Sequence, residues 1–318
     1  MKQNANRNLI ISLLVMAAMS GSPVFAGEGN ISASYLYTLS NFTGVYAISW
    51  GGVAVDEAVN EVYVFGGRGI KIFNDAGMEI YSFNDEQELG SVRSMAVDDE
   101  GNIIALVSGE NRFELIRCTY RGEPLSKIEL KNVPAGFTDF SPNGIIFRNG
   151  SFYLVDEVRM MVMVTDRAGL FKDGYDLAGL IGYTDQQRVD TGLGGFSVDR
   201  EGYLLFTIQA TAKAYVISPD RTTVRSVGKS GSTPGSFGIP GGIVADISGK
   251  YILVADTLRC CIVVFDRALN FRTEFGYRGF SPDAFIGPLG LAVDGRNRLY
   301  VTQLRDRGVS VYQIVAGG

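Results

Sequence analysis

The sequence predicts an all-β fold, a six-bladed β-propeller of four-stranded antiparallel blades whose last blade is closed by an N-terminal strand. Three observations support this prediction: a two-strand motif recurs six times, a third strand follows each copy, and the sixth copy stops at the chain end before a fourth strand. Four short strands in each period of about 40–50 residues are typical of propeller blades. A β-sandwich also has many short strands, but it does not repeat one motif in this way.

Each copy of the motif begins with a short apolar strand, turns at a polar cluster and continues into a second strand rich in Val, Ile, Leu and Tyr. The turn residues are separated by 42 to 51 residues along the chain. The six copies span residues 51–64, 94–107, 143–156, 194–207, 241–256 and 290–303. The turn residues are Asp56, Asp98, Arg148, Asp199, Asp246 and Asp294. We expect the aspartates to accept backbone N–H groups of their own turns rather than to act as catalytic pairs.

Third strands are expected soon after each pair, and fourth strands after most of them. The third strands are residues 70–73, 113–116, 162–165, 214–217, 262–265 and 309–312, and the fourth are 78–83, 125–130, 223–227 and 271–275. Residues 35–39 (YLYTL) form a spare strand before the first repeat. This strand can pair with the last blade and close the ring, which removes exposed strand edges.

The first 26 residues resemble a secretory signal peptide. Lys2 and Arg7 precede an apolar run over residues 9–20, and Val24 and Ala26 stand where a signal peptidase would read the chain. We therefore expect an exported protein, periplasmic or extracellular, with one propeller domain over residues 27–318. An uncleaved membrane anchor is the alternative.

Composition narrows the classes of function. Without Lys2 and Arg7 the chain has 27 basic and 34 acidic residues, a net charge of −7, so we expect no nucleic-acid partner. The sequence contains no histidine, which excludes Ser-His-Asp nucleophiles and imidazole zinc ligands. Cys118, Cys260 and Cys261 are odd in number, which in an exported protein gives no disulfide framework. We expect reduced thiols, with a vicinal disulfide between Cys260 and Cys261 as the alternative.

Residues 235–276 and 285–301 resemble the NHL repeat, and weaker copies extend the resemblance over the whole chain after residue 26. The resemblance implies a six-bladed ring with ligands at one face or in the channel mouth. It leaves activity open, because the family ranges from protein- and RNA-binding modules to metal-dependent lyases. The related lactonase-like propellers place Glu, Asn, Asp or His where the first strands begin. Here the corresponding residues are Gly52, Ser94, Gly144, Gly195, Gly242 and Gly290, so we expect no channel metal and no cofactor.

A basic residue precedes each third strand. Six-fold repetition would distribute these charges around one face, where guanidinium groups suit an anionic partner. Local hairpin contacts are the alternative role. The residues are Arg68, Arg112, Arg159, Lys213, Arg259 and Arg307.

The loops between blades carry many aromatic residues. We expect most of the phenylalanines to pack between blades, and we take Trp50 and Tyr277 as candidate contacts for a partner. The sequence therefore predicts a non-catalytic scaffold that binds a protein or an anionic polymer. A metal-dependent lactonase or lyase and a small-molecule sensor or carrier are the alternatives. The oligomeric state is not predicted.

Overall fold

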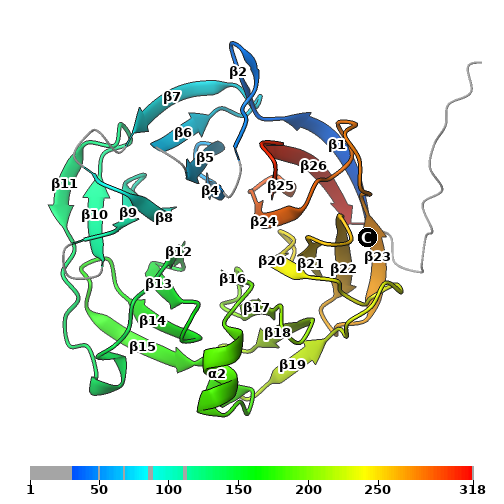
Figure 1. Cartoon of the computed structure of the whole chain (residues 1–318). Helices are drawn as coiled ribbons and strands as arrows, with labels where there is room; N and C mark the ends of the chain where they lie inside the picture. Colours follow the sequence, from blue (N-terminus) through cyan, green and yellow to red (C-terminus); the bar gives the residue numbers. More distant parts are fainter. Residues whose placement is uncertain (1–30, 49–50, 67–68, 85–88, 110–112, 317–318) are drawn as a thin grey trace, which may run out of the picture.

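The computed structural model describes residues 31–48, 51–66, 69–84, 89–109 and 113–316, which form six four-stranded antiparallel blades arranged in a ring (Figure 1). The innermost strands of the blades line a central channel. The predicted fold class is therefore confirmed. The predicted signal peptide, residues 1–26, lies outside the described residues. Within the described part of the chain, no helix has the length and apolar character needed to cross a membrane.

The strands of each blade follow one another from the channel outwards. Blade one contains β4 (Gly52–Asp56), β5 (Glu61–Gly66), β6 (Gly69–Phe73) and β7 (Glu79–Asn84). Blade two contains β8 (Val92–Val97), β9 (Ile103–Val107), β10 (Glu114–Cys118) and β11 (Pro124–Lys127). Blade three contains β12 (Gly144–Arg148), β13 (Ser151–Asp156), β14 (Met161–Thr165) and β15 (Phe171–Asp176).

The second half of the ring repeats this order. Blade four contains β16 (Gly195–Val198), β17 (Leu204–Ile208), β18 (Lys213–Ile217) and β19 (Val224–Val227). Blade five contains β20 (Pro240–Ala245), β21 (Tyr251–Asp256), β22 (Cys261–Asp266) and β23 (Phe271–Phe275). Blade six contains β24 (Pro288–Val293), β25 (Arg298–Gln303), β26 (Val309–Ala316) and, as its outer strand, β1 (Ile31–Thr38).

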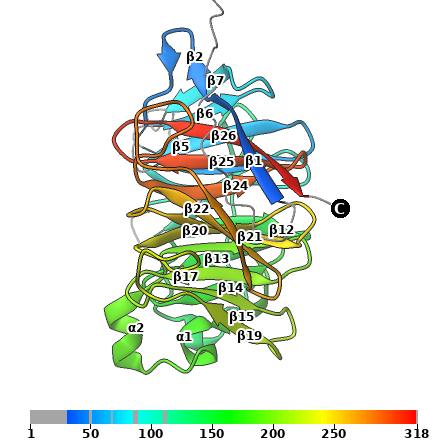
Figure 2. The same cartoon turned by 90° about the vertical axis from the view of Figure 1, so that its right-hand side faces the viewer.

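The strand β1 closes the ring as predicted, although it begins earlier than residue 35. It pairs antiparallel with β26 from Ile31 opposite Ala316 to Thr38 opposite Ser310 (Figure 2). The rings of Tyr35 and Tyr312 meet edge to face, with centroids 5.7 Å apart. The two ends of the chain are thus joined by backbone hydrogen bonds and side-chain packing.

The core formed by the described residues consists of six apolar clusters, each lying between neighbouring blades. The cluster between blades three and four, for example, contains Val162, Leu204, Phe206 and Ile208, all fully buried. Full burial of one such side chain stabilises the fold by about 1.5–3 kcal/mol. The ring is therefore held together by blade-to-blade packing.

The turn aspartates accept hydrogen bonds from their own turns, as predicted. The Oδ1 atom of Asp98 accepts the backbone N–H groups of Glu100 at 3.0 Å and Asn102 at 2.9 Å. The same arrangement recurs at Asp199, which accepts from Glu201 at 2.9 Å and Tyr203 at 2.8 Å.

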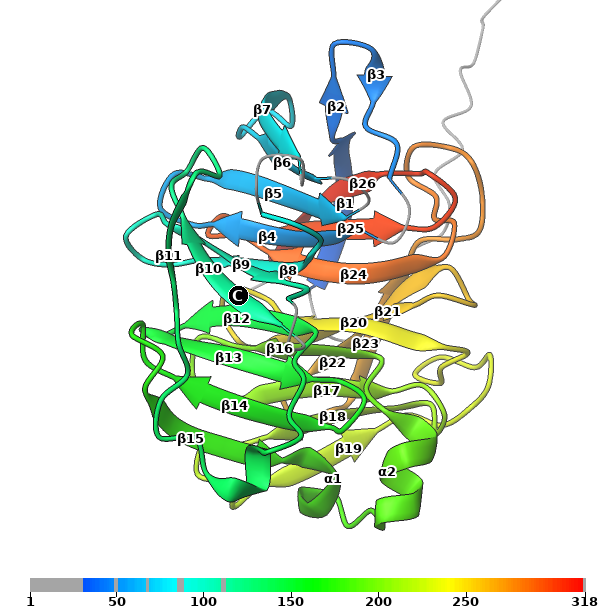
Figure 3. The same ribbon diagram turned by 60° about the vertical axis from the view of Figure 1, so that its left-hand side comes forward.

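The connection between blades three and four contains two helices that the sequence analysis did not predict. They are α1 (Leu177–Leu180) and α2 (Asp185–Thr191), and α2 begins with a capping box between Thr184 and Gln187. A short 3-10 turn, η1 (Ala135–Phe137), lies before blade three. The connection from β1 to blade one forms a small hairpin, β2 (Ser40–Asn41) and β3 (Gly44–Val45), that projects from the ring (Figure 3).

Candidate functional site

One face of the ring, called here the top face, carries the loops between blades and the loops between second and third strands. Two of its inter-blade loops, residues 228–240 and 276–288, have the same conformation. Isolated parallel bridges join Ser230 to Phe237 in the first loop and Arg278 to Phe285 in the second. Phe237 and Phe285 are fully buried beneath the loops, as predicted for most of the phenylalanines. Both loops are thus fixed by an internal bridge and by a buried ring.

In blades five and six, the side chain of the last residue of the second strand accepts hydrogen bonds from the inter-blade loop before that blade. Asp256 is fully buried, and its carboxylate accepts N–H groups of the loop from Gly238 at 2.7 Å and Ile239 at 3.2 Å. The same carboxylate accepts the N–H of Arg259 at 3.0 Å in the neighbouring turn. In blade six, Gln303 accepts the N–H of Ile286 at 2.9 Å. The sequence analysis missed these residues, although a polar side chain ending an apolar strand was a visible signal.

The guanidinium of Arg259 is bound within its own blade. It donates to both carboxylate oxygens of Glu274, at 2.7 and 2.8 Å, and to the carbonyl oxygen of Ser236 at 2.9 Å. Only 14% of the Arg259 side chain is exposed. Arg259 therefore links β23 to loop 228–240, which is the local role considered as the alternative to anion binding.

Arg307 holds the second loop in a related way. Its guanidinium donates to the carbonyl oxygens of Phe280 at 3.1 Å and Ser281 at 2.9 Å. Arg278 within that loop donates to the carbonyl oxygen of Leu258 at 3.0 Å, which connects the loop to the turn of blade five. These contacts of Arg307 and Arg278 fix the backbone of the loop and of the neighbouring turn.

The other predicted site residues do not converge on one point. Arg159, in blade three, is 45% exposed and lies 3.6 Å from the carboxylate of Asp156. Lys213 begins β18 in blade four and is partly buried. Arg68, Arg112 and Trp50 lie outside the described residues. A continuous basic ring therefore remains a prediction.

Four large apolar side chains are exposed on the loops that these contacts hold. Ile239 is 38% exposed, Leu258 53%, Tyr277 47% and Phe280 76%. We call these four residues the blade 5–6 patch. Phe280 is an exception to the prediction that most loop phenylalanines pack between blades, whereas Phe140, Phe237 and Phe285 are buried. Tyr277 belongs to the patch, and its hydroxyl is hydrogen bonded to Ser281 at 2.7 Å.

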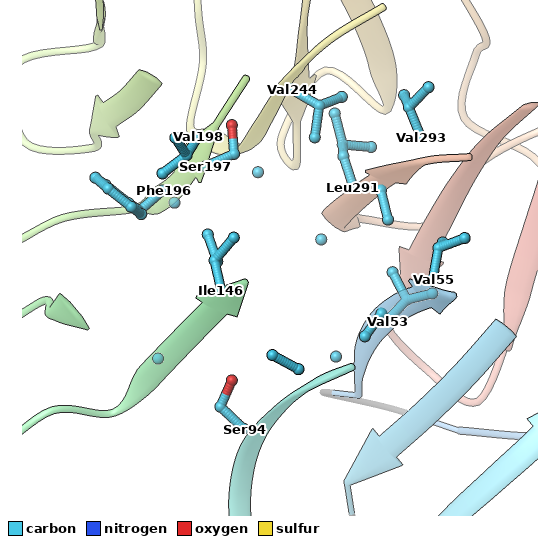
Figure 4. A pocket seen from close by; sticks show the side chains of 18 of the residues that line it. Val53, Val55, Ser94, Ile146, Phe196, Ser197, Val198, Val244, Leu291 and Val293 are labelled. Atoms are coloured by element: carbon cyan, nitrogen blue, oxygen red, sulfur yellow. The ribbon is translucent and has the colours of Figure 1, made fainter. Parts of the chain in front are cut away.

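The central channel is the second candidate site. It encloses a cavity of about 540 Å³, and the first strands of all six blades line it (Figure 4). The five glycines and one serine expected at the strand beginnings do line the cavity. At Gly242 a Cβ atom would lie 2.7 Å from the carbonyl oxygen of Leu289, so glycine allows neighbouring inner strands to approach closely.

Charged groups lie at the two ends of this channel. At the lower end, Glu57 of blade one forms ion pairs with Arg148 of blade three and with Arg200 of blade four, on the opposite side of the ring. Near the top face, the side chain of Asn143 donates to Glu157 at 2.5 Å. Burial raises the pKa of the Glu157 carboxyl above its usual value, and the neighbouring charge of Asp156 adds to this.

The thiols of Cys118, Cys260 and Cys261 are free and buried in the structure. Among the described residues, no three Cys, Asp or Glu side chains are grouped so that they could hold a metal ion. The described charged side chains of the channel instead form ion pairs or hydrogen bonds with other side chains or with the backbone of turns.

Neither a family model nor a curated protein matches this chain. Solved structures resemble it at low identity. A protein of unknown function from Bacteroides thetaiotaomicron is 12% identical, covers 91% of this chain and 77% of its own, and gives a TM-score of 0.63. Virginiamycin B lyase from Staphylococcus aureus is 16% identical, covers 89% of this chain and 88% of its own, and gives a TM-score of 0.52. A gluconolactonase from Xanthomonas campestris is 14% identical, covers 90% of this chain and 91% of its own, and gives a TM-score of 0.56. These likenesses show a related six-bladed propeller fold.

Proposed function

We propose that this protein is an exported, non-catalytic binding module of NHL-type repeats that engages a protein partner through the blade 5–6 patch. The observation that carries the proposal is the exposure of Ile239, Leu258, Tyr277 and Phe280 on loops whose backbones are held by buried contacts. Exposed aromatic and aliphatic side chains that cluster on one face are typical anchors of protein interfaces.

Rigid loops favour binding because little conformational entropy is lost when the partner arrives. Arg307 fixes the backbone at Phe280, and Arg278 fixes the turn that carries Leu258. Arg278 lies in loop 276–288 and Arg305 follows Leu304, whose N–H bonds to that loop at Ile286, and both arginines are exposed. A partner with an apolar centre and an acidic rim would match this surface.

The contacts of the arginines favour a protein partner over an anionic polymer. A polymer would be recognised mainly through free guanidinium groups, whereas those of Arg259 and Arg307 already bind a carboxylate and backbone carbonyls. Catalysis like that of the similar lyase and gluconolactonase is the alternative. The glycines at the strand beginnings of this chain support binding over catalysis, because they offer no side chain to a metal or a substrate.

Site-specific photo-crosslinking in the native cell tests this proposal. A photo-reactive residue at Phe280 is expected to give one discrete protein adduct. The same residue at Val59, which is 57% exposed in a turn on the opposite face, is the matched control and is expected to give none. The same adduct at both positions, or no adduct at Phe280, would contradict the proposal.

The variant Phe280→Ser then measures the contribution of one anchor. Ser232 occupies the corresponding position in loop 228–240, so the loop conformation accepts serine. Loss of the ring that the partner would bury should weaken partner binding by about 2 kcal/mol, roughly thirtyfold. Val59→Ser should leave binding unchanged.

A further inference from the structure

We infer that Asn41 carries an N-linked glycan, which gives this protein a covalent modification site outside the two candidate sites described above. Asn41, Phe42 and Thr43 form the triplet Asn-x-Ser/Thr, with a middle residue other than proline, that accepts such glycans in exported proteins. The inference rests on the export proposed above. It uses none of the residues of the blade 5–6 patch, so it stands separately from the proposed protein partner.

The triplet lies at the tip of the hairpin formed by β2 and β3, which projects from the ring (Figure 3). Asn41 pairs with Gly44 across the hairpin, so Phe42 and Thr43 form the turn, and both are exposed. A surface turn is the structural context that this triplet requires, because the transferring enzyme must reach the amide.

The base of the hairpin is fixed to two blades. The N–H of Leu39 donates to the carbonyl oxygen of Val309 in blade six at 3.0 Å, and the N–H of Ser40 donates to that of Gly77 in blade one at 2.9 Å. Leu39 itself is fully buried. The tip is therefore held away from the blades on a firm support, where an attached glycan would not disturb the ring.

The side chain of Asn41 folds back onto its own turn. Its Oδ1 atom accepts the N–H of Thr43 at 2.9 Å and the hydroxyl of Thr43 at 2.7 Å. Because a backbone N–H can only donate, the side-chain atom that faces it is the oxygen. Among the residues that the structure describes, none is hydrogen bonded to the Nδ2 atom of Asn41. The Thr43 hydroxyl thus holds the amide oxygen while the nitrogen remains available for reaction.

Phe42 provides a second, independent observation. Its side chain is 97% exposed, more than any other large apolar side chain in the described part of the chain. Leaving an aromatic ring in water is unfavourable, and covering it with apolar surface is favourable. A sugar attached to the neighbouring Asn41 can lay its C–H face on this ring. A glycan therefore accounts for an aromatic residue at a position that no described part of the protein covers.

The reaction replaces one N–H bond of the Asn41 amide by a bond to a sugar. The donor is an oligosaccharide joined through a diphosphate to a polyprenol, and an oligosaccharyltransferase of the exporting cell catalyses the transfer. A bond forms between Nδ2 and the anomeric carbon as the bond from that carbon to the diphosphate breaks. The polyprenyl diphosphate leaves, and a base of the transferase takes the amide proton.

A second triplet in the chain provides a built-in control. Asn149, Gly150 and Ser151 match the same pattern in the turn between β12 and β13. Here the Nδ2 atom donates to the carbonyl oxygen of Arg200 at 3.2 Å, and Ser151 is buried. We therefore expect Asn149 to remain unmodified. A third triplet begins at Asn30, which lies outside the described residues.

Mass spectrometry of chymotryptic peptides, from protein purified from its native cells, tests this inference. Cleavage after Tyr37 and Tyr46 separates Asn41 from Asn30. We expect the peptide over residues 38–46 to carry at least one hexose or N-acetylhexosamine residue on Asn41. The peptide that contains Asn149 should carry none.

Three variants of the exposed tip, where substitutions change stability little, make the test specific. Asn41→Gln and Thr43→Ala should each abolish the modification, whereas Thr43→Ser keeps the hydroxyl and should retain it. An unmodified Asn41, or a sugar that persists on Asn41 in Thr43→Ala, would overturn the inference. The N-terminal peptide separates this failure from a failure of export: a chain that begins at Gly27 but has an unmodified Asn41 is exported without the glycan.

Discussion

Replacing Arg259 by methionine removes the charge that joins loop 228–240 to β23 while keeping most of the apolar stem. In the folded protein this guanidinium makes two hydrogen bonds to Glu274 and one to the carbonyl oxygen of Ser236. The variant leaves the Glu274 carboxylate and that carbonyl without these donors. We expect Arg259→Met to destabilise the fold and to loosen the loop that carries Ile239.

The size of the effect follows from the burial of the pair. An exposed ion pair contributes about 0–1 kcal/mol, and breaking a fully buried one costs about 3–5 kcal/mol. The side chains of Arg259 and Glu274 are 14% and 30% exposed, which places this pair between the two cases. The loss of unfolding free energy should therefore be about 2–3 kcal/mol, and Glu274→Gln should cost less because its amide oxygen can still accept a bond.

Urea denaturation of the two single variants and the double variant measures the coupling between the side chains. A double-mutant cycle should give about 1–2 kcal/mol. A coupling below about 0.3 kcal/mol would show that Arg259 is effectively solvated and available to an anionic partner. That result would refute its assignment as a residue that fixes the loop.

Three further predictions concern the channel glycines, the thiols and Glu157. Gly242→Ala should destabilise the fold by about 1–3 kcal/mol in urea denaturation, because the added Cβ meets the backbone of β24. Gly136→Ala, with open space around the added Cβ, should change stability by less than about 0.5 kcal/mol in the same assay. Burial raises the pKa of the Cys118 thiol to about 11 and that of the Cys261 thiol to about 12. Iodoacetamide at pH 8 should therefore alkylate neither thiol until urea unfolds the chain, which mass spectrometry would measure. Burial also raises the pKa of Glu157, so the folded state holds this proton more tightly and stability should fall as pH rises above about 4, the pKa of a glutamate in the unfolded chain. Glu157→Gln should remove that slope, and an unchanged slope in urea curves would contradict the assignment.

The ring was predictable because its signals are local and repeated. Each turn residue and the strands beside it lie within a few residues of one another, so the strand–turn–strand pattern is visible in every copy, although Arg148 replaces the aspartate in the third. The closing strand was predicted because the sixth repeat lacked its fourth strand and a spare strand preceded the first. Helix α2 could have been found from Thr184 and Gln187, which have the spacing of a capping box.

The site was less predictable because its contacts join distant parts of the chain. Glu57 and Arg200 are separated by 143 residues, and only the closed ring places them together. The basic residue before the third strand is visible in the sequence. The role of Arg259, however, depends on Glu274, which the pairing of the third and fourth strands brings beside it. Phe280 and Phe285 are the same residue type in the same loop. Phe280 is 76% exposed and Phe285 is fully buried, because only Phe285 lies beneath the loop.

Hydrogen exchange of the protein with and without the partner captured at Phe280 tests the central claim most directly. The proposal predicts that binding protects amides in loops 228–240 and 276–288 and in the turn at residues 257–260, the segments that surround the blade 5–6 patch. Protection confined to the opposite face, such as the turn around Val59 or that around Tyr120, would contradict it.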